Sequence, residues 1–378
     1  MRSNYKRLGN YIRPVNERNK ALEGKTLHGV SIQKKFIPSI ANIIGTDMST
    51  YKIIYKNQFA YGPVTSRNGD KISIALLEEC EEAIISQAYT SFEIIDPKQL
   101  LPEYLMMWFR RPEFDRYARF MSQGSAREIF DWEEMCNTTL PVPTIDKQRE
   151  IIKEYNVIAD RIKLNNQLIQ KLEETAQAIY KQWFVDFEFP DENGLPYKSN
   201  GGEMVESELG EIPKGWKVRE LQELILFKNG KLKPILAGEY PVYGGNGIVE
   251  YVNKFNSEDV IAIGRVGAYC GSLFRVLGKC WISDNAISAK SNQNFNMFCF
   301  YILDNLNLNE RSEGTGQPLI TQGLLNGIKI IIPVVDIISK FDKIMKLLFI
   351  NSDLKSKELA LIEKMRDTLL SKLATIKN

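Results

Sequence analysis

Loop-forming segments in two parts of the sequence carry side chains that can read hydrogen-bond patterns. In the first part, residues 61–71 supply the candidate contacts Ser66, Arg67, Asn68 and Lys71. In the second part, two glycine-containing segments and the segment Ser-Asp-Asn-Ala at 283–286 supply the candidates Tyr243, Asn246, Arg265, Tyr269, Asp284 and Asn285. Arginine can pair with O6 and N7 of guanine, asparagine can pair with N6 and N7 of adenine, and hydroxyl or ammonium groups can bind phosphates. The set predicts contacts with duplex DNA, although a plain surface turn is the alternative for any single residue.

Two further candidate loops belong to an internal repeat. Residues 124–127 (Gly-Ser-Ala-Arg) precede Pro143 at the same spacing at which residues 314–317 (Gly-Thr-Gly-Gln) precede Pro333. A long segment with heptad spacing follows each copy. A repeat of this length indicates a duplicated domain rather than a solenoid unit. The candidate DNA contacts in these two loops are Ser125, Arg127, Thr315 and Gln317.

The sequence lacks the motifs of several enzyme classes. It contains no Gly-x-Gly-x-x-Gly dinucleotide motif, no Gly-Lys-Ser/Thr phosphate loop and no Asn/Asp-Pro-Pro-aromatic loop of the kind that adenine methyltransferases use. His28 is the only histidine, which argues against a histidine-dependent triad or metal hydrolase. The five cysteines include no Cys-x-x-Cys pair, so neither a zinc site nor a disulfide framework is expected. We expect no catalysis, no metal and no cofactor in this chain.

The charge is nearly balanced overall but uneven along the chain. The formal net charge is +2, yet the first 35 residues contain nine lysines and arginines against two glutamates. Lys34 and Lys35 of this basic stretch are candidate DNA contacts, and a solvated surface is the alternative. The sequence shows no secretory signal and no apolar run long enough to span a membrane. We therefore expect a reduced, cytoplasmic protein with no membrane partner.

The patterning predicts a mixed α/β (α+β) protein with two similar lobes. Strand-like runs separated by Gly, Asn and Asp occur in residues 1–145 and again in residues 216–334. Pro102 is expected to begin an aromatic-rich helix that packs on the first sheet. Residues 189–215, which are rich in Gly, Ser and Glu, are expected to connect the first half of the chain to the second lobe.

Each lobe is followed by a predicted long helix, in residues 146–188 and 335–378. Apolar residues from Ile151 to Trp183 alternate by steps of four and three, which is the spacing of a coiled-coil strand. Asn165 is the polar member of this seam and is interpreted as a buried residue that fixes the register. A polar stretch at 351–357 interrupts the second seam. We predict that the two helices form a long antiparallel coiled coil that joins the lobes with pseudo-twofold symmetry.

The sequence resembles the specificity subunits of type I restriction-modification systems over essentially its whole length. The resemblance is carried by residues 177–187 (Gln-Ala-Ile-Tyr-Lys-Gln-Trp-Phe-Val-Asp-Phe), 209–216 (Leu-Gly-Glu-Ile-Pro-Lys-Gly-Trp), 283–287 (Ser-Asp-Asn-Ala-Ile) and 314–317 (Gly-Thr-Gly-Gln). Residues 124–127 depart from the Gly-Thr-Gly-Gln form, so a contact by Arg127 is less secure than one by Gln317.

This resemblance implies a division of labour between the chain and its partners. The lobes would be two target recognition domains that bind the halves of a split sequence in double-stranded DNA. The paired helices would act as a spacer and as the docking surface for two methyltransferase subunits, with restriction subunits joining in some systems. Those methyltransferases would carry S-adenosylmethionine and methylate an adenine in each half-site. The candidate partner-binding residues are Tyr180, Trp183, Phe184 and Phe187.

Two other interpretations remain open from the sequence. The chain could be the specificity subunit of a combined restriction-methylation polypeptide, which no residue distinguishes from separate partners. It could also be a coiled-coil scaffold without a DNA role, which the candidate loops and the basic N-terminal stretch argue against.

Overall fold

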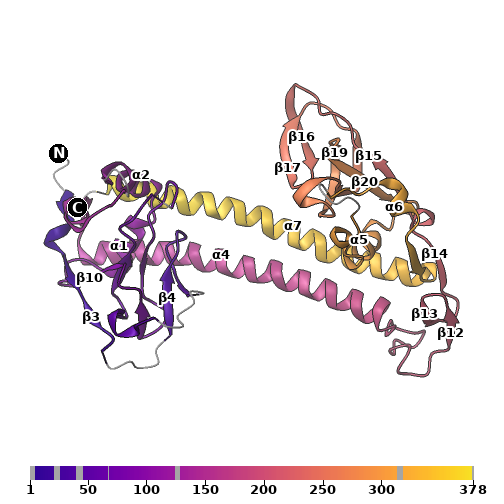
Figure 1. Cartoon of the computed structure of the whole chain (residues 1–378), viewed down its shortest axis with the longest axis horizontal. Coiled ribbons are helices and arrows are strands. Elements are labelled where there is room, and N and C mark those ends of the chain that lie inside the picture. Colours follow the sequence, from indigo (N-terminus) through magenta and orange to yellow (C-terminus); the bar gives the residue numbers. More distant parts are fainter. Residues whose placement is uncertain are drawn as a thin grey trace. The chain divides into compact units, whose positions relative to one another are not determined.

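The computed structural model describes residues 5–20, 26–39, 46–66, 68–123, 128–312 and 318–376. The chain divides into two compact units (Figure 1). Unit 1 comprises residues 1–165 and 357–378, and unit 2 comprises residues 166–356. Each unit therefore combines one lobe with one end of each long helix. No helix among these described residues is long and apolar enough to cross a membrane.

The lobe of unit 1 contains two main sheets and three short helices. The four-stranded sheet has the order β2 (Ile12–Val15), β10 (Thr90–Ile94), β7 (Phe59–Tyr61), β8 (Ile74–Leu76), with antiparallel neighbours. The five-stranded sheet has the order β3 (Glu17–Arg18), β6 (Lys52–Tyr55), β9 (Glu82–Ile85), β4 (Leu27–Val30), β5 (Phe36–Pro38), and only β4 and β9 are parallel. The helices are α1 (Pro102–Phe109), α2 (Pro112–Met121) and α3 (Trp132–Asn137). As predicted, Pro102 begins α1, whose aromatic residues lie in the core.

The lobe of unit 2 is built around one larger sheet. Its order is β15 (Ile225–Asn229), β20 (Ala286–Ser291), β18 (Ser257–Gly264), β19 (Leu273–Ile282), β16 (Ala237–Gly244), β17 (Gly247–Val252). All neighbours are antiparallel except β16 and β19. Two helices accompany the sheet, α5 (Asn296–Asn305) and α6 (Gln322–Asn326). Helix α5 is buried because its residues 297–303 are apolar on nearly every side.

The two lobes share a framework that confirms the duplication. In unit 1, β1 (Tyr5–Arg7) pairs antiparallel with β11 (Thr139–Pro141), and Leu8 N donates to Thr138 O over 2.8 Å. In unit 2, β14 (Lys217–Glu220) pairs antiparallel with β21 (Lys329–Ile332), and Leu221 N donates to Ile328 O over 2.8 Å. A side-chain N-cap begins the helix before the second strand in each case, Asp131 for α3 and Thr321 for α6.

The long helices are α4 (Ile145–Tyr180) and α7 (Val335–Lys372), and they lie side by side in each unit (Figure 1). In unit 1, Arg161 Nε donates to Glu358 Oε1 over 2.8 Å, and the apolar ends of both helices join the lobe core. In unit 2, the Trp183 ring lies 5.9 Å from the Phe341 ring. These contacts confirm the antiparallel pairing and the mixed α+β fold.

The heptad seam of α4 is also confirmed. The seam residues between Ile151 and Trp183 are all buried or half-buried, and Asn165 is fully buried. The polar stretch at 351–357 does not break α7, which continues through it with Ser352 and Lys355 half-buried. A helix can carry such a stretch because its stability comes from packing of the flanking turns.

The segment expected as a connection has regular structure of its own. Strands β12 (Met204–Ser207) and β13 (Gly210–Pro213) form an antiparallel hairpin. Phe189 stacks on Tyr197 at 4.6 Å and on Trp216 at 5.0 Å between ring centroids. These contacts place residues on both sides of the hairpin in the core of unit 2.

Candidate nucleic-acid interface

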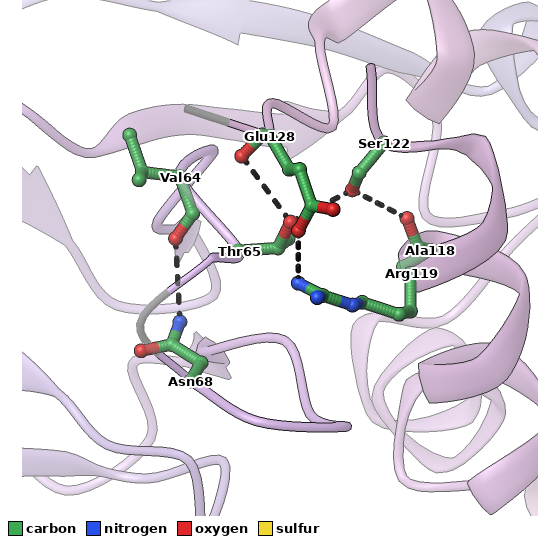
Figure 2. A network of polar contacts seen from close by, with 7 residues as sticks. All are labelled: Val64, Thr65, Asn68, Ala118, Arg119, Ser122 and Glu128. Carbon is green, nitrogen blue, oxygen red and sulfur yellow. Dashed lines mark hydrogen bonds and ion pairs between the residues drawn. The ribbon is translucent and has the colours of Figure 1, made fainter. Parts of the chain in front are cut away.

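In unit 1, two loops are joined into one element, here called the arm of unit 1, made of residues 62–66, 68 and 128–130. Thr65 N donates to Glu128 O over 2.9 Å, and Phe130 N donates to Pro63 O over 2.8 Å. Figure 2 shows the buried Thr65 hydroxyl between Glu128 O and the Ser122 hydroxyl, at 3.2 and 2.9 Å. The loops are therefore held by main-chain groups, by the buried Thr65 hydroxyl and by an ion pair between Arg119 Nη1 and Glu128 Oε2 at 2.5 Å (Figure 2).

The arm of unit 1 ends in a tight turn that carries candidate residues. Asn68 N donates to Thr65 O over 3.0 Å, and Asn68 Nδ2 reaches back to Val64 O over 3.4 Å (Figure 2). Ser66 is exposed in this turn, and Lys71 is exposed just beyond it. The structure thus brings Ser66, Asn68 and Lys71 together, while Arg67, Ser125 and Arg127 lie outside the described residues.

Lys34 does not belong to this surface. Only 6% of the residue is exposed, its Nζ lies 2.7 Å from Asp115 Oδ1, and a second hydrogen bond goes to Phe109 O. Burial lowers the pKa of the Lys34 ammonium group, while Asp115 favours its charged form. The expectation that Lys34 contacts DNA is corrected, because its charge is neutralised inside the lobe. Lys35, its neighbour, is exposed.

In unit 2, all three candidate segments converge. Arg265 N donates to Asn285 O over 3.0 Å, and Ser283 N donates to Tyr243 O over 3.0 Å. A side chain at Gly245 would lie 3.8 Å from both Asn285 O and Tyr269 Cβ. These segments are well separated in the sequence, and the fold of unit 2 brings them together into one surface.

The candidates of unit 2 differ in how much they present to solvent. Asn246, Tyr269, Asp284 and Asn285 are exposed, whereas Arg265 and Tyr243 are half-buried. Burial raises the pKa of the Tyr243 hydroxyl, which keeps it protonated as a hydrogen-bond donor. Thr315 and Gln317 lie outside the described residues, so their expected contacts remain predictions.

Unit 2 contains an arm with the same main-chain bonds as the arm of unit 1. In this arm of unit 2, made of residues 264–270 and 318–320, Gly267 N donates to Pro318 O over 3.1 Å and Ile320 N donates to Arg265 O over 2.9 Å. Its turn is closed by Cys270 N donating to Gly267 O over 3.0 Å. These three bonds correspond, in the same order, to the bonds of unit 1 in which Thr65 N, Phe130 N and Asn68 N are the donors. The exposed side chains of the turn differ, with Ser66 in one arm and Ala268 and Tyr269 in the other.

One neighbour of this surface was missed from the sequence. Gly230 N donates to Ala286 O over 2.9 Å, and Lys231 N donates to Ile282 O over 3.0 Å. A side chain on Gly230 would overlap the carbonyl group of Ser283. The Asn229-Gly230 pair was the available signal, since such a pair marks a tight turn.

Of the four residues expected to bind a partner, Trp183 lies in the core of unit 2, and the other three are half-buried and pack against this core. Trp183 is buried, and the rings of Tyr180 and Phe184 lie 6.0 and 4.8 Å from the Phe341 ring. Phe187 meets the ring of Trp216 edge-on at 5.6 Å. These contacts pack the four side chains against α7 and the lobe. Trp183 is too buried to meet a partner, whereas partner binding by the half-buried Tyr180, Phe184 and Phe187 remains a prediction.

The chemistry of the surface is that of hydrogen bonding. In the parts of the chain that the structure describes, no three His, Cys, Asp or Glu side chains are grouped so as to hold a metal ion. The candidate residues offer amide, hydroxyl and carboxylate groups at two turns with fixed main chains. Such an arrangement can read donor and acceptor patterns on a ligand.

Comparison with known proteins shows which proteins this chain resembles. Residues 213–364, which include the arm of unit 2, match the type I restriction modification DNA specificity domain. The chain is 24% identical over 316 residues to the type I restriction enzyme MjaIX specificity subunit of Methanocaldococcus jannaschii, covering 75% of this chain and 70% of that one. This chain is thus similar in sequence to type I specificity subunits.

A second relative and a solved structure agree with this assignment. The chain is 26% identical over 165 residues to the HindI specificity subunit of Haemophilus influenzae, covering 42% of this chain and 35% of that one. The crystal structure of a type I restriction-modification S subunit from M. genitalium superposes with a TM-score of 0.67 at 18% identity, covering 99% and 96% of the two chains. Type I specificity subunits are the non-catalytic components that give these systems their DNA specificity.

Proposed function

We propose that this chain recognises a bipartite sequence in double-stranded DNA, with one half-site bound by the lobe of each unit. The observation that carries the proposal is the pair of arms with matching main-chain bonds and different exposed side chains. Two arms that share the same main-chain bonds but carry different side chains suit the recognition of two half-sites of different sequence. The match of residues 213–364 to a DNA specificity domain supports the same function.

The partners that we propose are inferred from the similarity to type I specificity subunits. We propose that two methyltransferase subunits dock on the long helices, carry S-adenosylmethionine and methylate an adenine in each half-site, and that restriction subunits join this complex. Because Trp183 is buried and its aromatic neighbours are half-buried, we propose that the docking surface includes outward-facing residues of α4 and α7. Val157 of α4 and Leu361 of α7 are both more than 60% exposed in unit 1. Exposed apolar side chains of this size often mark protein interfaces.

The long helices would set the distance between half-sites. Both helices continue from one unit into the other without a break. At about 1.5 Å per residue, one inserted heptad lengthens a helix by about 10 Å. Insertion of one heptad in α4 together with one in α7 should therefore lengthen the unspecified gap and leave both half-sites unchanged.

The test is single-molecule methylation mapping in a host that carries this chain and its methyltransferase partner. Asn68→Ala in unit 1 and Asn285→Ala in unit 2 should each relax specificity in one half-site only, while Gln182→Ala, in the π-helical turn Lys181–Val185 that follows α4, should leave the target unchanged. Changes in both halves from either single variant would contradict the assignment of one half-site to each lobe. A chain whose presence directs no methylation would refute the proposed function.

A further inference from the structure

Residues 231–236 (Lys-Leu-Lys-Pro-Ile-Leu), here called the apolar loop, expose large apolar side chains between β15 and β16. The exposed fractions are 79% for Leu232, 102% for Ile235 and 67% for Leu236. Single exposed apolar residues are ordinary, but adjacent ones mark a binding surface. This loop was not among the residues singled out from the sequence.

The apolar loop is anchored at both ends. At its start, Lys231 N donates to Ile282 O over 3.0 Å, and Trp281 Nε1 donates to Lys231 O over 3.0 Å. At its end, Asn253 N donates to Leu236 O over 3.1 Å. Pro234 restricts the backbone between these anchors. The exposed side chains therefore project from a preorganised loop, which lowers the entropy that binding would cost.

The anchors place the start of the apolar loop beside the candidate interface of unit 2. Lys231 forms a parallel β-bridge with Ser283, which directly precedes Asp284 and Asn285. Gly230 N bonds to Ala286 O on the other side of those two residues. A ligand that reaches the exposed Asp284 and Asn285 therefore also approaches Lys231.

We propose that the apolar loop is a second DNA-contacting element of unit 2, in which Leu232 and Ile235 pack against thymine methyl groups in the major groove and Lys231 lies near a phosphate. The inference rests on the proposed function. The thymine C5-methyl group is the apolar feature that the major groove offers, and apolar side chains contact it. Lys231 favours a polyanion over a protein partner, since lysine is depleted in protein interfaces; Lys233 is already paired with Glu250.

The experiment is equilibrium binding of the full-length chain, with any methyltransferase that co-purifies, to a labelled duplex carrying its mapped target. A second duplex has uracil in place of thymine throughout the half-site of unit 2, which removes the methyl groups alone. Ile235→Ala should weaken binding to the thymine duplex by roughly tenfold, as expected for loss of one apolar contact. On the uracil duplex the wild type should lose about as much, and Ile235→Ala should lose nothing further.

Three controls make the result specific. Leu226→Ala removes a leucine that is 49% exposed on β15, shortly before Gly230, and should bind like the wild type. Lys231→Gln should reduce the slope of log affinity against log salt by about 1, whereas Ile235→Ala should leave that slope unchanged. Unchanged melting temperatures should show that the variants fold, and Leu232→Ala provides a second test of the same contact.

Two outcomes would overturn the inference while leaving the proposed function intact. One is equal binding of both duplexes by the wild type and by Ile235→Ala. The other is loss of methyltransferase co-purification in Ile235→Ala with unchanged DNA affinity, which would make the apolar loop a protein-docking element. A wild-type chain that binds no target duplex would instead refute the proposed function, and the inference with it.

Discussion

Replacing Trp183 by alanine should destabilise unit 2 rather than weaken partner binding. Trp183 is 8% exposed, and its ring lies 6.2 Å from Phe184 and 5.9 Å from Phe341. A tryptophan side chain buries about 200 Å², and at about 25 cal/mol per Å² its burial contributes about 5 kcal/mol. Alanine retains part of this area and the site relaxes, so we expect a loss of about 3–5 kcal/mol.

Urea denaturation followed by circular dichroism measures this loss. With an m value of about 2–3 kcal/mol per molar urea, a loss of about 4 kcal/mol lowers the midpoint of the transition of unit 2 by about 1.5–2 M. Gln182→Ala, at the exposed neighbouring position, should leave the midpoint within about 0.3 M of the wild type. If Trp183→Ala kept the wild-type midpoint but no longer co-purified with a methyltransferase, Trp183 would be a docking residue and the reasoning from burial would be wrong.

Three further predictions follow from buried charges and thiols. Lys34→Met should cost about 3–5 kcal/mol of stability, because it leaves the Asp115 carboxylate buried without its cation. The same substitution should not change the salt dependence of DNA binding. As a control, Lys35→Met should leave the urea midpoint nearly unchanged. Arg275 stacks between two phenylalanine rings and pairs with Glu173 at 2.6 Å. Arg275→Lys should lower the free energy of unfolding by about 1–2 kcal/mol, since an ammonium group cannot reproduce planar stacking. A urea midpoint equal to that of the wild type would contradict this prediction. Burial raises the pKa of Cys299 to about 12, so the thiol of the unfolded chain loses its proton at a lower pH than the thiol of the folded chain. The contribution of this thiol to stability is therefore complete below about pH 9 and declines from there toward pH 12. Thermal melts should show this decline in the wild type and not in Cys299→Ala; the same pH dependence in both would contradict the prediction.

The elements that local patterns specify could be predicted from the sequence. Pro102 marked the start of α1, and the heptad spacing from Ile151 to Trp183 marked α4 and its inward face. Periodicity predicts which side of a helix is buried, but it does not say what covers that side. For this reason the aromatic residues at the end of α4 were assigned to a partner, although α7 and the lobe of unit 2 cover them.

Contacts between distant residues could not be predicted. Lys34 lies in a basic stretch and its carboxylate partner, Asp115, is remote in the sequence, so nothing nearby signals its burial. The correspondence of the two arms was hidden for a related reason. The chain between Thr65 and Glu128 is longer than the chain between Gly267 and Pro318, so no single shift aligns both segments. Unit 1 carries the additional helix α2 between its two segments.

The way the arms are held affects how readily their tips can mutate. The bonds that the two arms share join amide and carbonyl groups, which every amino acid except proline supplies in full. Substitutions at Ser66, Ala268 or Tyr269 therefore remove no bond that closes either turn. New side chains can accumulate there at little cost in folding, which gives the molecule a route to altered recognition by single substitutions.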